Sequence, residues 1–401
     1  MVLKENELNG EPTFPTEMLL KIVGKGLGIP QDVGADFPFR TKVSDKQLFA
    51  FLRWHRFGQH FLRGMDERAG AFRQSSFRDA LKKEVGLGVQ QNLFLSQNLI
   101  ILCGALAHAE IPHVVLKGIP LSVEAFGDPG IRMCRDIDIL ISPKFHEQTA
   151  KVLANLGMVL EGKCREVPFS ARRHYSYSEI WFGQGWLLDL HWGFSSQGQP
   201  FGVLVETALS QRRYIQVFEK EVPVLDWDTQ FLYLIHHAAK HLWLRFFWIS
   251  DVYALGRRLE QAEWERLADR AAGLGISRQF WFSLKLVSEV FGWTLPLSIP
   301  PALHRFIEKT YQDWEILAFA DTDYTRKRIL EIPPQRVLVW SLKLSDRWIT
   351  RASLLAGWVF KPSASDITTL KLPRGFWWLY PIWRVIRLLI RSTIFSGKNR
   401  K

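Results

Sequence analysis

The sequence has few cysteines and no long apolar run. Its 401 residues include only Cys103, Cys134 and Cys164, without a C-x-x-C pair, so neither a disulfide framework nor a zinc ribbon is expected. There is no run of about 18 uncharged apolar residues, which excludes an ordinary transmembrane helix. The first residues carry mixed charge and lack the apolar segment of a signal peptide. Together these absences predict a cytoplasmic globular protein.

Acidic residues are scarce at the C-terminal end of the chain. Residues 335–401 contain thirteen Lys and Arg against two Asp, although the whole chain has a net charge of only +12. Residues 1–334 are therefore nearly neutral. This distribution makes nucleic acid a less favoured partner than a small molecule, because nucleic-acid-binding domains concentrate positive charge on the binding face.

The basic C-terminal segment is also rich in tryptophan. Trp377–Trp383 leads into Arg384, Arg387 and Arg391, which are spaced three and four residues apart. This pattern predicts a basic amphipathic helix over residues 376–395. Three partners fit such a helix: an anionic membrane surface, with the protein peripheral on the inner face of the membrane, another protein, or the protein's own core.

Two carboxylates alternate with aliphatic residues in the stretch Arg135–Leu140. Successive side chains of a strand point to opposite faces, so Asp136 and Asp138 are expected on one face, about 7 Å apart. At that spacing the two charges repel unless a cation lies between them, and a divalent ion such as Mg²⁺ is the simplest candidate. The competing interpretation is a solvent-facing pair on an edge strand.

A phosphate-binding turn is predicted upstream of these acids. The β-branched stretch Val114–Leu116 is followed by Lys117 and Gly118, and a helix begins near Ile119 with Pro120 in its first turn. A helix N-terminus with unpaired backbone N–H groups, a flexible glycine and an adjacent lysine is suited to hold phosphate. It would face the two acids if the flanking strands are neighbours.

A third carboxylate lies downstream, in the alternating strand predicted over Trp186–Trp192. Asp189 lies at its centre, and His191 shares the same face because it is two residues further on. His191 is a candidate second-shell donor or acid/base, with aromatic packing beside Trp192 as the alternative. Three carboxylates beside a helix N-terminus suit two-metal phosphoryl chemistry.

A helix predicted over Asp228–Leu242 carries His237 and His241 on one face, with Lys240 beside them. Such a histidine pair can bind zinc, but the acid of an H-E-x-x-H motif is absent. Contact with a nucleotide and buried structural hydrogen bonding are the other two interpretations. Asp251 is a candidate second-shell group that would orient a histidine N–H.

Taken together, these motifs resemble an uncharacterised bacterial nucleotidyltransferase family within the DNA polymerase β-like superfamily. The resemblance rests on the segments LKG, RDIDIL, LLDLHW and HAAKH, and it covers approximately residues 15–300. It implies transfer of an NMP group from an NTP to a hydroxyl or phosphate acceptor. The superfamily begins its phosphate-binding helix with Gly-Ser, whereas this chain has Lys117-Gly118, so the resemblance leaves open how the triphosphate is held.

The predicted site combines the residues above with the expectations from this family. Asp136, Asp138 and Asp189 are the expected catalytic metal ligands, with Mg²⁺ or Mn²⁺ as cofactor. Arg132 and Arg135 are candidate cations for the transition state, or else they form salt bridges with the carboxylates. The full nucleotide-binding set comprises Lys117, Gly118, Arg132, Arg135, His237, Lys240 and His241.

The predicted fold class is α+β, with a small mixed sheet at its centre. We divide the chain into four segments: an N-terminal helical region (1–110), the nucleotidyltransferase core (111–225), a helical lobe (226–330) and the basic Trp-rich tail (331–401). The competing functional interpretation is a non-catalytic protein that binds a nucleotide or a partner at the membrane surface. The sequence names neither the NTP nor the acceptor.

Overall fold

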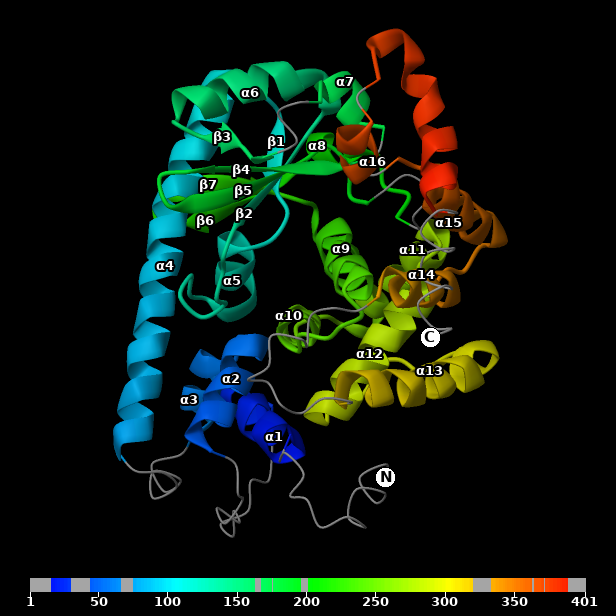
Figure 1. The fold of residues 1–401 in the computed structure, drawn as a ribbon. Helices are drawn as coiled ribbons and strands as arrows, with labels where there is room; N and C mark the ends of the chain where they lie inside the picture. The colour runs from blue at the N-terminus through cyan, green and yellow to red at the C-terminus, as the bar shows by residue number, and fades with distance from the viewer. Residues whose placement is uncertain are drawn as a thin grey trace, which may run out of the picture.

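A seven-stranded mixed β-sheet has helices on both of its faces (Figure 1). The computed structural model describes residues 16–29, 44–65, 75–162, 167–174, 176–195, 201–319, 333–362, 364–370 and 372–388. Along the sheet, the strands follow the order β3-β4-β5-β2-β1-β7-β6. The predicted α+β class, a mixed sheet with flanking helical regions, is confirmed.

The centre of the sheet carries the predicted motifs. β2 pairs antiparallel with β1 on one side and parallel with β5 on the other, while β1 also pairs parallel with β7. The two outer hairpins are antiparallel. The strands are β1 (His113–Val115), β2 (Ile137–Ile141), β3 (Val159–Leu160), β4 (Ser178–Gly183), β5 (Trp186–His191), β6 (Arg213–Val217) and β7 (Lys220–Val224).

A hairpin at the Gly183-Gln184-Gly185 turn joins β4 to β5. Its two loop residues, Gln184 and Gly185, have φ angles of 50° and 85°. Positive φ at both central positions is the requirement of a two-residue turn whose twist matches that of the flanking strands. The turn thereby sets the register that brings Asp189 opposite Ile180.

Most of the described chain is helical. The N-terminal helices are α1 (Thr16–Gly26), α2 (Asp45–His55), α3 (Gly58–Gly64) and α4 (Ser75–His108). The helices between strands are α5 (Ile119–Phe126), α6 (His146–Asn155), α7 (Phe169–Arg172) and α8 (Val205–Ser210). The C-terminal half contains α9 (Trp227–Lys240), α10 (Phe247–Gly256), α11 (Gln261–Leu274), α12 (Ser277–Phe291), α13 (Pro301–Phe319), α14 (Pro334–Lys343), α15 (Trp348–Phe360) and α16 (Ala364–Thr369).

Two apolar clusters cover opposite faces of the sheet. Ile139 belongs to a cluster with α4 and α6, whereas its neighbour Leu140 belongs to a larger cluster shared by α1, α2, α5 and helices α9 to α13. The long helix α4 contributes to both, since it runs from the sheet down to the N-terminal helices (Figure 1). The N-terminal helices and the helical lobe therefore share a core; our division into four segments stays a prediction.

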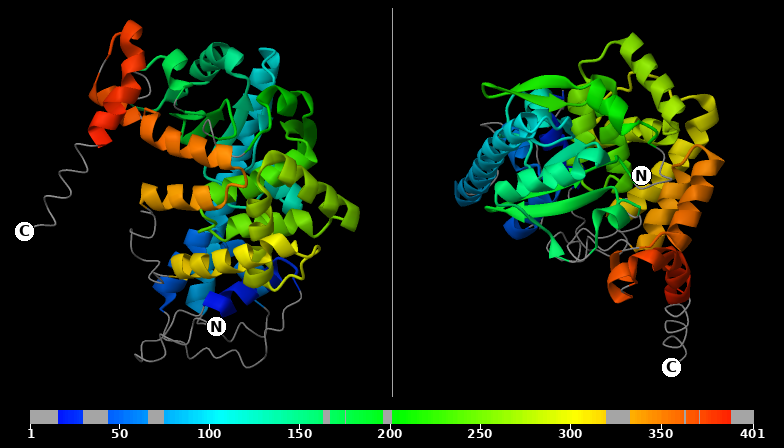
Figure 2. Two further views of the ribbon diagram at one scale, coloured as in Figure 1. Left: turned by 90° about the vertical axis from the view of Figure 1, so that its right-hand side faces the viewer. Right: turned by 90° about the horizontal axis from the view of Figure 1, so that it is seen from above.

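The described part of the C-terminal tail packs on the protein itself (Figure 2). A 3₁₀ turn, Arg374–Leu379, leads into helical residues 380–388. Tyr380 and Ile367 join a small apolar cluster with Val167 and Ala171, next to α7. Residues 389–395 of the predicted amphipathic helix, including Arg391, lie outside the described residues.

Two of the arginines that we considered for membrane contact bind a carboxylate instead. Arg384 Nη1 lies 3.2 Å and Arg387 Nε lies 2.6 Å from the Asp366 carboxylate, which is completely buried. These contacts correspond to the third of our alternatives, a tail docked on the protein's own core. Within the described ranges, no helix has the length and apolar character needed to cross a membrane.

Candidate active site

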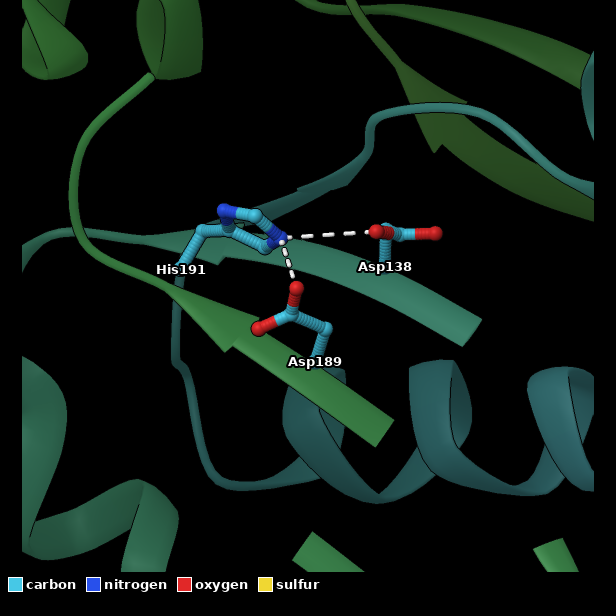
Figure 3. Close-up of side chains that lie close together, drawn as sticks. All are labelled: Asp138, Asp189 and His191. Carbon is cyan, nitrogen blue, oxygen red and sulfur yellow. Dashed lines mark ion pairs between the residues drawn. The ribbon is translucent and has the colours of Figure 1, made fainter. Parts of the chain in front are cut away.

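Strand pairing brings two predicted acids and a histidine together. Because β2 and β5 are parallel neighbours, Asp138 lies in register with Asp189, and Leu140 with His191. The side chains of Asp138, Asp189 and His191 project from the same face of the sheet (Figure 3). His191 Nε2 lies 3.4 Å from Asp138 Oδ1 and 3.1 Å from Asp189 Oδ2. These three side chains form the carboxylate floor of the site.

Lys117 supplies a positive charge to this floor. The backbone N–H of Leu116 donates to the Asp138 carbonyl at 3.0 Å, which places the next side chain beside the acid, and Lys117 Nζ forms an ion pair with Asp138 Oδ2. Burial alone would raise the pKa of Asp138, but Lys117 and His191 outweigh it and hold that pKa well below its usual range. Lys117 therefore neutralises the charge that we expected a metal ion to balance alone.

Asp136 differs from the predicted arrangement. Strand β2 begins at Ile137, so Asp136 is half-buried in the turn before the strand and does not belong to the group formed by Asp138, Asp189 and His191. It still lines the same cavity. Asp138 is thus paired with Lys117, whereas Asp136 precedes the strand, and its role as a metal ligand stays a prediction.

The donors of the floor fit a metal ion. One ligand atom each from Asp138, Asp189 and His191 lies within 4.8 Å of the others. Asp189 Oδ1 and His191 Nδ1 are buried without a hydrogen-bond partner among the described residues, and such orphaned atoms are uncommon unless a ligand completes them. Carboxylate oxygens suit Mg²⁺ or Mn²⁺. Burial lowers the pKa of His191, but the Asp189 and Asp138 carboxylates raise it to about 9, so His191 is a cation that pairs with these carboxylates, and the two carboxylates are the metal-binding groups of the floor.

The turn for which we predict phosphate binding has the expected backbone form. Gly118 caps α5 with φ of 85° and ψ of −132°, a conformation that only glycine adopts readily. The helix begins at Ile119, with a proline in its first turn, so its N-terminal N–H groups open next to Lys117. Strand, glycine turn and helix are therefore arranged as expected, and both Lys117 and Gly118 line the cavity.

Helix α9 supplies one wall. Gln230 Nε2 donates to the Leu116 carbonyl at 2.6 Å and so fixes the helix against β1. His237, Lys240 and His241 then line the cavity. Burial and the nearby cations lower the pKa of His241 to about 4 and that of Lys240 to about 8, because a charged side chain there is poorly solvated. His237 and His241 are neutral, with ring centroids 4.9 Å apart.

Asp251 has a different partner from the one expected. It accepts hydrogen bonds from Arg132, with Nε at 2.9 Å and Nη2 at 3.0 Å, and both side chains are buried. Asp251 therefore orients Arg132 and not a histidine. Arg132 lines the cavity, whereas Arg135 is exposed in the turn before β2 and is not among the lining residues.

The cavity has a volume of about 480 Å³, enough for a nucleotide-sized ligand. The sequence interpretation missed five of its polar and aromatic lining residues: Trp54, Arg56, Tyr177, Arg245 and Trp248. They come from α2, the chain before β4 and the turn that leads into α10. The only sequence signal was the aromatic and basic stretch that follows the HAAKH segment, at residues 243–248.

One model of a known protein family matches the part of the chain that contains the site. The family model described as uncharacterised nucleotidyltransferase matches residues 41–292. The chain belongs to this family. The match includes β1, β2, β5, α5, α9 and α10, and it covers all the predicted site residues of this nucleotidyltransferase. A search of curated proteins found no match.

Proposed function

We propose that this nucleotidyltransferase moves an NMP group from an NTP to a hydroxyl or phosphate acceptor, with Mg²⁺ or Mn²⁺ as cofactor. The observation that carries the proposal is the convergence of Asp138 and Asp189 beside Lys117 and the start of α5. Metal-binding carboxylates and a phosphate-binding helix terminus within one cavity are what phosphoryl transfer requires.

In the proposed reaction an acceptor oxygen attacks the α-phosphorus, and the bond from that phosphorus to the β-phosphate oxygen breaks. Asp138, Asp189 and Asp136 would hold the metal, which when bound lowers the pKa of the acceptor hydroxyl and neutralises charge on the phosphates. Lys117 and the N–H groups at the start of α5 would bind the departing pyrophosphate. Asp189 Oδ1, without a hydrogen-bond partner in the described chain, would face the acceptor hydroxyl.

The other predicted site residues would orient the carboxylates or contact the nucleotide. His191 contacts both carboxylates and would fix their orientation. Arg132, held by Asp251, would offer its guanidinium to the phosphates, and Arg135, exposed in the turn before β2, stays a candidate. His237, Lys240 and His241 would contact the nucleotide, since neutral imidazoles can donate or accept hydrogen bonds.

The direct test is transfer of a labelled nucleotide. The purified protein is incubated with each of the four labelled NTPs, with Mg²⁺ or Mn²⁺ and a cell extract as source of acceptor, and labelled products are identified by mass spectrometry. Calorimetry on Lys117→Ala should show roughly ten- to a hundredfold weaker NTP binding, since a charge-assisted contact is worth about 1.5–3 kcal/mol. Unchanged NTP affinity in that variant would remove Lys117 from the site.

A non-catalytic role at a membrane surface is the second candidate function. Its supporting observation is α15, a helix without buried residues on which Trp348 and Phe360 have 75% and 55% of their surface exposed. Exposed aromatic residues beside basic ones are typical of interfacial helices. Binding to anionic vesicles that is lost in Trp348→Ser would support a cytoplasmic protein peripheral to the membrane; equal binding would reject α15 as the contact.

A further inference from the structure

Two arginines and two tryptophans line the side of the cavity that lies away from the sheet and from α9. Trp54 and Arg56 come from the end of α2, and Arg245 and Trp248 from the turn before α10 and its first residues. The Arg245 guanidinium lies 4.6 Å from the centre of the Trp54 ring. The Arg56 guanidinium lies 4.6 Å from the centre of the Phe247 ring. We call these four lining residues the arginine wall.

Among the described residues, no carboxylate forms an ion pair with the arginines of this wall, although the Asp136 charge acts on Arg245 from across the cavity. Arg132, the nearest buried arginine, has Asp251 as partner, but neither Arg56 nor Arg245 forms an ion pair with a described carboxylate. Arg56 Nη1 donates to the Met133 carbonyl at 2.9 Å, and its Nε is buried without a hydrogen-bond partner in the described ranges. Burial and the neighbouring arginines lower the pKa of Arg56 to about 10. Cations grouped in this way are stabilised by an anionic ligand.

The wall is held in place by contacts that reach across the sequence. The backbone N–H of Phe246 donates to His55 Nδ1 at 3.1 Å, and Trp54 Nε1 donates to the Leu244 carbonyl at 3.3 Å. Burial lowers the pKa of His55 well below its usual range, so the ring is neutral and can accept this bond. The end of α2 and the turn before α10 therefore form one rigid unit.

The backbone is strained at one position in the wall and at two positions just before Arg245. Arg56, Leu242 and Trp243 have φ angles of 56°, 54° and 50°, although none of them is glycine. Side chains rarely adopt this region unless the surrounding structure imposes it, and such residues cluster at ligand sites. Arg56 stands where α2 ends, a position at which glycine is preferred. An arginine there points to a role for its side chain.

We propose that the arginine wall binds a phosphate group between Arg56 and Arg245. Guanidinium groups match phosphate oxygens in charge and geometry. The group belongs either to the triphosphate of the NTP or to a phosphorylated acceptor, and the second source rests on the proposed function. Either way, the N-terminal helices outside the sheet supply substrate-binding residues that complete the site.

The test compares the wild-type protein with Arg56→Gln and Arg245→Gln. Arg53→Gln is the matched control, because Arg53 lies on the same helix but is exposed and pairs with Glu84 away from the cavity. In the first arm, calorimetry measures the affinity for inorganic tripolyphosphate and for each Mg²⁺·NTP. In the second, inorganic phosphate is titrated into protein saturated with Mg²⁺ and NTP analogues that carry a methylene bridge between the α- and β-phosphates.

If the wall holds the triphosphate, both wall variants bind tripolyphosphate and an NTP about tenfold more weakly, and Arg53→Gln does not. If it holds a phosphorylated acceptor, NTP affinity is kept and phosphate binding in the second arm falls about tenfold. Affinities within about twofold of wild type in both arms overturn the proposal. Should Arg56→Gln not fold, Arg245→Gln gives the same comparison. Weakened tripolyphosphate binding without any nucleotidyl transfer would reject the proposed function and leave the wall as a phosphate site.

Discussion

Two carboxylates on neighbouring strands have different surroundings, which indicate a structural role for one and ligand binding for the other. In the β4–β5 hairpin Glu179 lies opposite Leu190, and Ile180 lies opposite Asp189. Because side chains alternate along a strand, Glu179 and Asp189 point to opposite faces of the sheet. Each has a histidine within 3.1 Å of a carboxylate oxygen. Their remaining surroundings differ.

The Glu179 centre is complete. Its Oε1 lies 2.7 Å from His146 Nε2 and accepts a hydrogen bond from Trp181 Nε1 at 2.9 Å, while its Oε2 accepts from Arg172 Nη2 at 2.6 Å. The His146 ring also stacks on Phe169, with ring centroids 3.5 Å apart. These contacts fasten α6 and α7 to the sheet. No further ligand is needed at this centre.

The Asp189 centre is incomplete. No donor among the described residues reaches Asp189 Oδ1 in hydrogen-bonding geometry, although the nearby Ser178 hydroxyl helps to lower the Asp189 pKa, and Asp189 shares a single imidazole, that of His191, with Asp138. A buried polar atom that no partner satisfies is destabilising unless a ligand completes it. Both centres contain a carboxylate and a histidine, so residue type alone does not separate them. The two centres differ in how many of their carboxylate oxygens have a hydrogen-bond partner.

The largest effect is expected for Asp189→Asn. This change should lower kcat for nucleotidyl transfer by about a hundredfold to a thousandfold, the range for loss of one strong electrostatic contact to the transition state. The free energy of unfolding should fall by only about 1 kcal/mol, because the Asp189 side chain is partly exposed and His191 keeps Asp138 as a second carboxylate partner. Single-turnover assays and urea unfolding measure the two quantities. A large loss of stability with activity retained would make Asp189 structural.

Glu179→Gln should give the opposite result. The neutral side chain leaves the buried Arg172 guanidinium without a counter-charge, and removal of one partner of a buried ion pair costs about 3–5 kcal/mol of stability. The kcat per folded molecule should be unchanged, since Glu179 faces away from the cavity. Urea unfolding and the same transfer assay check this. If activity falls as it does in Asp189→Asn, the contrast between the two centres is wrong.

The parts of the site that the sequence predicted correctly depend on local patterns. Alternation along a strand correctly placed Asp189 and His191 on one face, and the Lys-Gly turn before a helix correctly placed Lys117 and Gly118. These are local patterns, which depend on backbone geometry alone. The start of β2 was placed before Asp136 because strand ends depend on tertiary hydrogen bonds, which the sequence does not show.

Long-range pairing was beyond the sequence. Asp251 meets Arg132 across 119 residues, and Trp54 meets Leu244 across 190. Neither pair has a fixed spacing that would reveal it, so Asp251 was assigned to a histidine and the arginine wall was missed. For a similar reason the sequence left three alternatives open for the basic tail, since the buried Asp366 that binds Arg384 and Arg387 is not recognisable from a local pattern.

Metal ions should distinguish the two centres with a smaller effect. Saturating Mg²⁺ or Mn²⁺ should stabilise the wild-type protein by about 1.4–2.7 kcal/mol, as expected for a ligand at ten to a hundred times its dissociation constant. Glu179→Gln should keep this increment on its lower baseline, whereas Asp189→Asn should lose most of it. Thermal melts with and without the ion, with Ca²⁺ as a comparison, provide the measurement. An equal increment in all three proteins would place the ion elsewhere.

The smallest expected effect is the pH dependence of the stability that the Glu179 centre contributes. Burial raises the pKa of Glu179, but His146 and Arg172 outweigh it and lower the folded-state pKa below the unfolded value of about 4.3. A carboxyl with a depressed pKa contributes stability above its unfolded pKa and loses it as pH falls through the folded pKa. The difference in unfolding free energy between wild type and Glu179→Gln should therefore be constant from pH 8 to about 5 and shrink below about 4.3.

Urea unfolding at a series of pH values measures this difference, with Asp313→Asn as a control on an exposed ion pair. A difference that persists unchanged into acid would show that Glu179 acts through packing and not through its charge.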